Sequence, residues 1–345
     1  MNANRLGSLN NPDLHNEHID ISDYCKKDLL NHLKNMIRIR MVEDYLAVMK
    51  RDGFIGGPVH LGAGQEAIAV GVSTHLTPAD KVFSTHRSHA HLLALGASLH
   101  GLFAEVLGKD SGLSRGMGGS MHLVCEPIGF YGSVPIVGGT IALAVGAALG
   151  EKLLNKNGVG LAYFGDGAAE EGVFHESMNL ASQMNLPVLF VVENNLFASH
   201  LHITQRQPCN SISRFAEAHN IDFQVVDGND VVSVARASRK LIDNARVHGS
   251  PGLLEAITYR RYGHVDWRED IDVGVNRSAD DMGKWRKRDP IKRLFNSLEL
   301  NGISNHDAIL ELEEGFKLEI ESAWRKAVED PYPNGGELLN RVYRS

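Results

Sequence analysis

Residues 158–195 read GVGLAYFGDGAAEEGVFHESMNLASQMNLPVLFVVENN. The stretch begins with an almost wholly apolar run that ends at Phe164, and a second apolar run extends from Pro187 to Val192. Short apolar runs without polar alternation are typical of strands that are buried on both faces of a parallel sheet. Because the residues between them, 168–184, have helical spacing, the stretch is predicted to form one strand–helix–strand unit.

The same alternation extends outward from this central unit. Further runs typical of strands lie at residues 80–84, 223–226 and 252–259, and segments with helical spacing join them. Repeated strand–helix–strand units predict an α/β fold with a doubly wound, mostly parallel sheet. From residue 278 onward the pattern is helical only. We expect three parts, namely a flexible tail (1–24), an α/β domain (25–280) and a C-terminal helical extension (281–345).

Composition limits the classes of protein to which the chain can belong. Its 345 residues are 43% hydrophobic and carry a formal net charge of −7. An acidic chain without a dense Lys/Arg stripe does not suit nucleic acid binding, and no apolar run reaches the roughly 18 residues of a membrane span. The three cysteines are far apart, so they suggest neither a disulfide framework nor a zinc motif. We expect a cytoplasmic protein that binds neither nucleic acid nor a membrane.

Two polar side chains stand where the strands of the central unit end. Asp166 follows the first strand and Asn195 follows the second. The carboxyl ends of parallel strands meet at one edge, where α/β proteins bind ligands, so these two side chains should be neighbours. Their oxygens are the ligands that Mg²⁺ prefers, and the helix beginning near Gly167 and Ala168 offers N–H groups to a phosphate. Alone, Gly165-Asp166-Gly167 would be an ordinary turn; paired with Asn195, it predicts a metal-bridged diphosphate site.

These residues also carry a resemblance to a known family. Gly165-Asp166-Gly167, followed along the chain by Asn194-Asn195, resembles the motif that binds thiamine diphosphate. From about Ile37 to Pro290 the chain is similar to the alpha subunit of the decarboxylating component of 2-oxo acid dehydrogenase complexes, of the pyruvate and acetoin types. Further motifs in the family's order support this: His60-Leu61-x-x-Gly64-Gln65-Glu66-Ala67, Arg87-x-His89, Gly118-Gly119-Ser120-Met121-His122, Ile136-Val137-Gly138, Tyr259-Arg260 and Gly263-His264.

The resemblance implies how the cofactors would be held. Thiamine diphosphate and Mg²⁺ are the implied cofactors, and the implied fold is the thiamine diphosphate-binding fold, in which this chain supplies the diphosphate-binding domain. Asp166, Asn195 and the backbone carbonyl of Phe197 would coordinate Mg²⁺, with diphosphate oxygens and a water completing an octahedron. The backbone N–H groups of Gly167 and Ala168 would contact the diphosphate.

Four more residues receive roles from the resemblance. Arg87 would donate charge-assisted hydrogen bonds to the diphosphate, and Val137 would touch the aminopyrimidine ring through its main chain. His60 and His264 would lie near the diphosphate at the mouth of the active site, where we expect them to be the catalytic side chains. His264 would donate a proton or a hydrogen bond to the reacting group.

The resemblance also implies partners. The glutamate that activates the cofactor is assigned to a separate beta subunit, so the chain should be inactive alone and work in an α2β2 heterotetramer. The substrate would be a 2-oxo acid or acetoin, and the acyl group would pass to a lipoyl-bearing acyltransferase. One alternative is a specialised acyl-transferring enzyme of a biosynthetic pathway, with no lipoyl partner. Another is a non-catalytic paralogue that only supports a beta subunit, although the intact set of site residues argues against it.

Several positions depart from the family pattern. His86 stands where the family commonly has Tyr, and Val134-Pro135 replaces an Asn-Gly pair. Val265 stands where mitochondrial members carry a phosphorylated Ser, and the loop 265–277 does not match the usual continuation. All these changes fall at the expected mouth of the site, which favours a divergent substrate or acceptor.

A zinc site is the rival hypothesis from another enzyme class. His86-x-x-His89-x-His91 places three imidazoles within one short segment. Zinc sites normally add a carboxylate or further histidine at matching spacing, and none follows nearby. The cationic Arg87 inside the segment would also repel a metal ion, so zinc is disfavoured.

Overall fold

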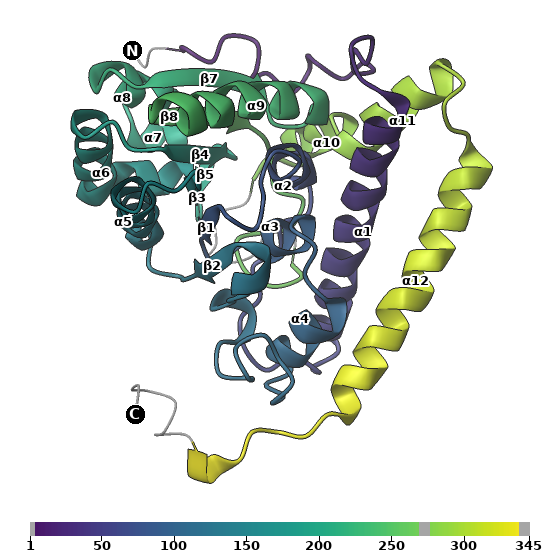
Figure 1. The fold of residues 1–345 in the computed structure, drawn as a ribbon. Helices are drawn as coiled ribbons and strands as arrows, with labels where there is room; N and C mark the ends of the chain where they lie inside the picture. The colour runs from purple at the N-terminus through teal and green to yellow at the C-terminus, as the bar shows by residue number, and fades with distance from the viewer. Residues whose placement is uncertain (1–3, 269–276, 338–345) are drawn as a thin grey trace.

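The computed structural model describes residues 4–268 and 277–337, and a six-stranded sheet forms its centre (Figure 1). The strand order is β2-β1-β3-β4-β8-β7, and every neighbouring pair is parallel. The predicted α/β fold with a parallel sheet is therefore confirmed. The strands are β1 (Lys81–Ser84), β2 (Phe130–Ser133), β3 (Gly160–Gly165), β4 (Val188–Asn194), β7 (Asp222–Asp227) and β8 (Gly252–Ile257).

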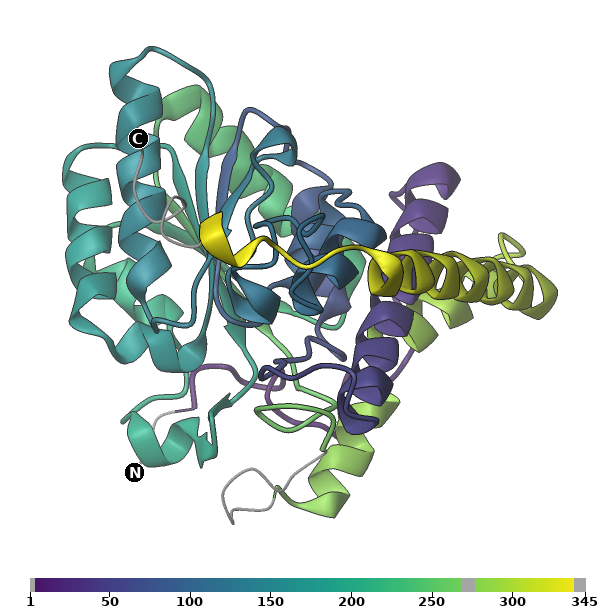
Figure 2. The same ribbon diagram turned by 90° about the horizontal axis from the view of Figure 1, so that it is seen from below.

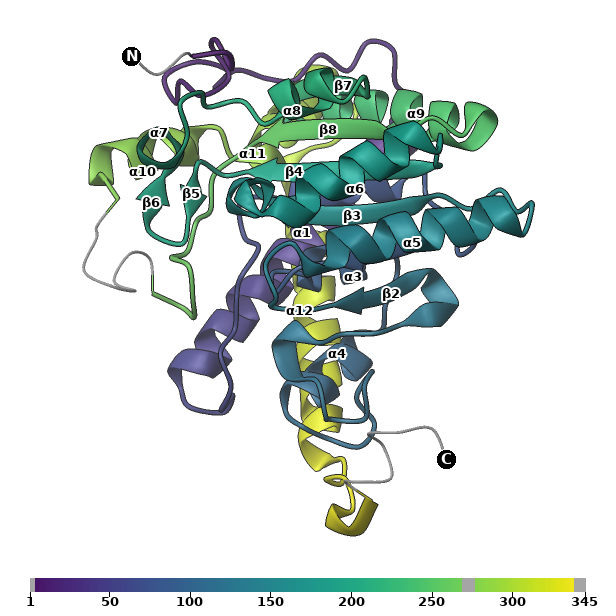
Figure 3. The same cartoon turned by 90° about the vertical axis from the view of Figure 1, so that its left-hand side faces the viewer.

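Two hydrophobic clusters cover the two faces of this sheet. Leu161 and Tyr163 of β3 belong to one cluster, and the alternating Ala162 and Phe164 belong to the other. The central strands are thus buried on both faces, as their apolar runs predict. Helices α5 (Gly139–Leu153), α6 (Gly172–Gln183) and α8 (Ser213–Ala218) cover one face (Figure 3). On the other face α9 (Val231–His248) packs on the strands, and the hydrophobic cluster there continues through α1 (Lys26–Arg51), α2 (Glu66–Ser73), α3 (His89–Ala94) and α4 (Leu99–Val106).

Three helices make up most of the described part of the chain after residue 277, and the last of them crosses α1 (Figure 2). Trp324 joins this helix to the core, because its ring packs edge-on against Tyr45 of α1 and Phe103 of α4, with centroid separations of 5.5 and 5.4 Å. None of the described helices combines the length and apolarity needed to cross a membrane. The three helices are α10 (Ala279–Lys287), α11 (Pro290–Leu300) and α12 (His306–Glu329).

Two local features differ from the sequence-based expectation. The sequence does not predict β2, whose residues 130–133 read FYGS and are too few to show a period. The single helix expected over residues 168–184 is split into a 3-10 turn (Asp166–Glu170) and α6. Glu171 separates them, because its backbone is extended, with ψ 139°. The split keeps the turn after β3 distinct from the helix that follows it.

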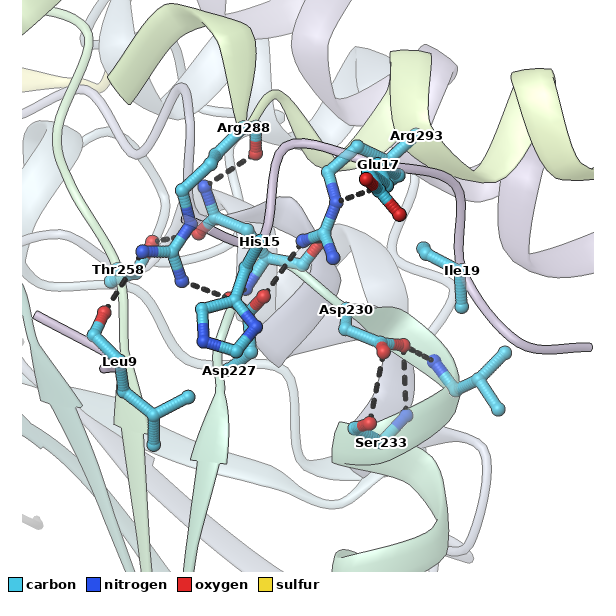
Figure 4. Close-up of polar contacts among 12 residues, drawn as sticks. Leu9, His15, Glu17, Ile19, Asp227, Asp230, Ser233, Thr258, Arg288 and Arg293 are labelled. Atoms are coloured by element: carbon cyan, nitrogen blue, oxygen red, sulfur yellow. Dashed lines mark hydrogen bonds and ion pairs between the residues drawn. The ribbon is translucent and has the colours of Figure 1, made fainter. Parts of the chain in front are cut away.

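Residues 4–24, called the N-terminal strap below, lie against the protein as a series of turns. The strap's polar composition predicts a flexible tail, yet Leu6, Ile19 and Ile21 are buried. Arg288 donates to the carbonyl oxygens of residues 9 and 11, and Arg293 donates to that of Glu17 (Figure 4). Isolated apolar side chains in a polar segment give no periodic signal, so composition does not reveal these contacts. The three-part division at residues 24 and 280 stays a prediction.

Candidate functional site

A cavity of about 330 Å³ opens at the carboxyl edge of the sheet. Its walls come from the segments that follow β1, β2, β3, β4 and β8 and from the loop that precedes α2. The structure brings every site residue named from the sequence to this one cavity, although the residues come from distant parts of the chain. They are His60, Arg87, Val137, Asp166, Gly167, Ala168, Asn195, Phe197 and His264.

Asp166 is the buried acidic group of this cavity. It follows β3 directly, and the pairing of Gly165 with Glu193 puts it beside the end of β4. Its side chain is only 1% exposed and forms an ion pair with Arg206. Burial raises the pKa of Asp166 above its ordinary value, and the charge of Arg206 offsets this only in part. A carboxylate removed from water and still short of positive charge is well suited to bind a metal cation.

The two consecutive asparagines after β4 have different surroundings. Asn194 is fully buried and donates to Glu255 on β8 over 2.8 Å, so it secures the sheet. Asn195 lines the cavity, donates to Gln65 over 3.1 Å, and accepts from the backbone N–H of Phe197 over 3.3 Å. The turn is possible because Leu196 has a positive φ of 69°. Asn195 therefore presents a hard oxygen beside Asp166, and Asn194 holds the strand end in place.

Arg87 ties two loops together at the side of the cavity. One guanidinium nitrogen donates to the carbonyl oxygen of Leu61 over 2.5 Å, and the other donates to that of His264 over 3.1 Å. The side chain is largely buried, with 6% of the residue exposed. The charge sits within the cavity lining, where it can attract an anionic ligand.

Three histidines gather at the mouth of the cavity. The ring centroids of His60, His86 and His264 lie 4.5 to 5.4 Å apart. Burial, followed by the charge of Arg87, lowers the pKa of His60 and His264 to about 3 and that of His86 to about 2. The three rings are therefore neutral near pH 7 and can each donate or accept a hydrogen bond. The Nδ1 atom of His60 is buried and has no partner within the described part of the chain.

The rival zinc segment does not assemble. His89 contacts Glu43 over 3.3 Å and Ser120 over 2.8 Å, whereas His91 contacts Ser84 and Glu193 over 2.8 and 3.1 Å. His86 instead joins His60 and His264, so the three imidazoles serve three different places. His86 lines the cavity at its mouth, where the departures from the family pattern are expected, and its place just after β1 is at the edge of the sheet that binds ligands.

Sequence reasoning missed Arg206 and Glu170. Arg206 is the last residue of α7 (Ile203–Arg206), and it forms ion pairs with both Asp166 and Glu170. Gln207 adds a 2.9 Å hydrogen bond to the same Glu170 carboxylate oxygen. No motif or period links these positions in the sequence, so only the folded chain reveals the contacts.

The backbone at the end of β3 leaves room for a diphosphate. A Cβ added to Gly165 would meet nothing within 4 Å, so this residue presents bare backbone to open space at the cavity wall. A Cβ added to Gly167 would lie 2.6 Å from that of Ala198, so glycine is needed for the close approach of the two loops. With Asp166 and Asn195 alongside, the donor set fits Mg²⁺, and Arg87 fits an anionic ligand that the metal would bridge.

The chain is similar in sequence to known proteins. The family described as "Dehydrogenase E1 component" matches residues 33–335. The alpha subunit of the acetoin:2,6-dichlorophenolindophenol oxidoreductase of Bacillus subtilis is 39% identical over 313 residues, which cover 90% of this chain and 92% of that protein. The corresponding subunit of Cupriavidus necator is 36% identical over 321 residues, with coverages of 93% and 95%. The pyruvate dehydrogenase E1 component subunit alpha of Rhizobium meliloti is 35% identical over 323 residues, with coverages of 93% and 92%. The chain therefore belongs to the dehydrogenase E1 component family.

Proposed function

We propose that this chain is the alpha subunit of a thiamine diphosphate-dependent dehydrogenase that acts on a 2-oxo acid or on acetoin. The observation that carries the proposal is the buried Asp166 carboxylate, which stands beside Asn195 at the carboxyl edge of the sheet. Relatives named for pyruvate and for acetoin support this activity over a specialised biosynthetic acyl transfer.

The cavity residues divide the work of holding the cofactor. Asp166, Asn195 and the carbonyl oxygen of Phe197 would hold Mg²⁺, whose charge would help to bind the diphosphate. The backbone N–H groups of Gly167 and Ala168 would donate to phosphate oxygens. Arg87, Val137 and His60 would complete the lining, with the Arg87 guanidinium as a charged donor and the Val137 main chain against the pyrimidine ring.

Thiamine diphosphate, when bound, supplies the electron sink that allows a bond beside a carbonyl carbon to break. The protein orients the reactants and moves protons. His264 and His60 line the cavity, and their lowered pKa values, about 3 each, keep both rings neutral at pH 7. A neutral imidazole would orient the reacting group by donating a hydrogen bond from its own N–H.

The activating glutamate would come from a beta subunit. Among the described residues that line the cavity, the carboxylates are Asp166 and Glu193, and both already have partners. Ile136 and Val137 beside the cavity are 70% and 49% exposed, which suits burial against another subunit. We expect an α2β2 heterotetramer in the cytoplasm, with a lipoyl-bearing acyltransferase as the acceptor.

Thermal unfolding of the chain co-expressed with its beta subunit tests the cofactor site. Thiamine diphosphate with Mg²⁺ should raise the Tm, and neither component alone should do so fully, because each would supply charge that helps to bind the other. The variant Asp166→Ala should lose this shift. The variant Glu176→Ala is the matched control, because Glu176 is an exposed acidic residue of α6 outside the cavity lining, and it should keep the shift. Stoichiometric zinc in the purified protein, or full activity of the chain as a monomer, would contradict the proposal.

A further inference from the structure

Arg206 connects the two loops that carry the proposed metal ligands. It lies at the end of α7, directly after the hairpin of β5 (Phe197–Ala198) and β6 (Leu201–His202). Its side chain is 7% exposed, so it is removed from solvent. Each nitrogen of the guanidinium has an acceptor: Nη2 bonds Oδ2 of Asp166, Nη1 bonds Oε1 of Glu170, and Nε donates to the carbonyl oxygen of Leu201 over 3.0 Å.

These contacts join two separate loops, which only the metal would otherwise hold together. Asp166 and Glu170 belong to the turn after β3, whereas Asn195 and Phe197 belong to the segment after β4. Arg206 is anchored to its own segment through the carbonyl of Leu201 and reaches across to the turn. Gln207 makes a second link to Glu170 over 2.9 Å. The two ligand-bearing loops are therefore fastened to each other by side chains of this chain alone.

The position of the guanidinium is compatible with a bound metal. Arg206 reaches Oδ2 of Asp166, so the other carboxylate oxygen, Oδ1, is left for coordination. A cation-binding carboxylate is commonly oriented by a hydrogen bond to its second oxygen, and loss of such a partner typically weakens metal binding. Glu170 supplies a second negative charge, which balances the guanidinium next to the site.

We propose that Arg206 is a positioning residue that preassembles the metal site. It fixes the Asp166 carboxylate and locks the segment 195–206 onto the turn 166–170 before the metal arrives. The inference rests on the proposed thiamine diphosphate function, and it explains how side chains of this chain hold the metal ligands in place. The opposite hypothesis is that Arg206 stands in for the metal and has to leave when the metal binds. The two hypotheses predict opposite signs for the effect of removing it.

The test measures the Mg²⁺ concentration needed for half-maximal thiamine diphosphate binding, by calorimetry on the chain co-purified with its beta subunit. Arg206→Gln should raise this concentration by about 10- to 100-fold, while kcat at saturating Mg²⁺ stays within a few-fold of the wild-type value. Arg206→Lys keeps the charge but cannot make all three bonds, so it should restore only part of the loss. Glu170→Gln removes one anchor and should have a smaller effect of the same sign.

Arg214→Gln is the matched control. Arg214 donates to Gln207 over 3.2 Å and stacks on Phe215. It is a nearby arginine whose described contacts include neither Asp166 nor Glu170. It should leave the Mg²⁺ requirement unchanged. A merely structural role for Arg206 predicts instead that kcat and Tm fall together without a change in the Mg²⁺ requirement.

Unchanged or tighter Mg²⁺ binding by Arg206→Gln would overturn the proposal in favour of a competing cation. If Arg206→Gln fails to fold, Arg206→Lys and Glu170→Gln decide, and the proposal is overturned if both bind Mg²⁺ like the wild type. A wild-type protein that does not bind thiamine diphosphate at all would refute the proposed function instead, so the two failures are distinguishable.

Discussion

Two buried aspartates at the carboxyl ends of parallel strands have opposite electrostatic surroundings. Asp166 follows β3 and pairs with Arg206, whereas Asp227 ends β7 and pairs with Arg288 and Arg293 over 2.9 and 2.8 Å. Burial raises the pKa of Asp166 despite its one arginine. Burial also acts to raise the pKa of Asp227, but the two arginines outweigh it and the pKa is lowered.

The difference separates a structural carboxylate from a functional one. Asp227 also accepts the backbone N–H of Asn229 over 3.0 Å, and its arginines hold the N-terminal strap (Figure 4). This group is saturated with donors and has no need of a ligand. Asp166 lines a cavity and is short of positive charge. Burial alone therefore does not mark a site; burial without enough counter-charge does.

The largest expected effect comes from Asp227→Asn, because it leaves two buried guanidiniums without their counter-charge. Such a change should lower the free energy of unfolding by about 3–5 kcal/mol, as measured by urea denaturation at neutral pH. Asp222→Asn at the exposed start of the same strand is the control and should stay within about 0.5 kcal/mol. A loss under about 1 kcal/mol at Asp227 would show that the triad is not a structural anchor.

Asp166→Asn should have the opposite effect, with little loss of stability and a large loss of ligand binding. Without ligands, its free energy of unfolding should change much less than that of Asp227→Asn. A neutral amide suits the buried position, and Arg206 still has its ion pair with Glu170. The stabilisation by thiamine diphosphate and Mg²⁺ should disappear, a loss of about 2.7 kcal/mol at ligand concentrations of 100 times Kd. Unfolding free energies with and without ligands, compared with those of Asp227→Asn, measure this. If the ligands stabilise both variants equally, Asp166 does not bind the metal and does not differ from Asp227 in function.

The sequence predicts the Asp166 half of this comparison well. Apolar runs reveal buried strands, chain order places Asp166 and Asn195 at one edge of the sheet, and nine named residues do surround one cavity. These inferences work because strand periodicity and parallel topology are local or nearly local properties. What each of these residues does in the site stays a prediction.

The Asp227 half could not be predicted. Asp227 is separated from Arg288 by 61 positions and from Arg293 by 66, and no spacing rule links a strand end to a helix that far away. The contact of Arg206 with Asp166 has the same character. Ion pairs between distant segments depend on how helices pack after the sheet has formed, so they leave no periodic trace in the chain.

Arg288→Met tests whether the ion-paired group of Asp227, Arg288 and Arg293 also restrains the N-terminal strap. Arg288 is fully buried and donates to the carbonyl oxygens of Leu9 and Asn11, which would lose their donors. Unsatisfied buried polar groups typically cost about 1–3 kcal/mol, less than in Asp227→Asn because Arg293 still neutralises the aspartate. The strap should also become cleavable by protease before the rest of the protein unfolds. Protection equal to the wild type would show that the apolar contacts of Leu6 and Ile19 hold it alone.

The smallest expected effect is a difference in how stability depends on pH. Asp227 has a folded pKa below its ordinary 3.8, so its contribution is present above pH 3.8 and is lost as the pH falls through the folded pKa. Asp166 has a folded pKa above 3.8, so its contribution is present below pH 3.8 and is lost as the pH rises through the folded pKa. Without ligands, acidification should therefore narrow the gap between the wild type and Asp227→Asn, and should improve the wild type relative to Asp166→Asn. Urea titrations of the three proteins from about pH 6 to about pH 3 measure both trends, and slopes of the same sign would mean that the two carboxylates do not differ in counter-charge.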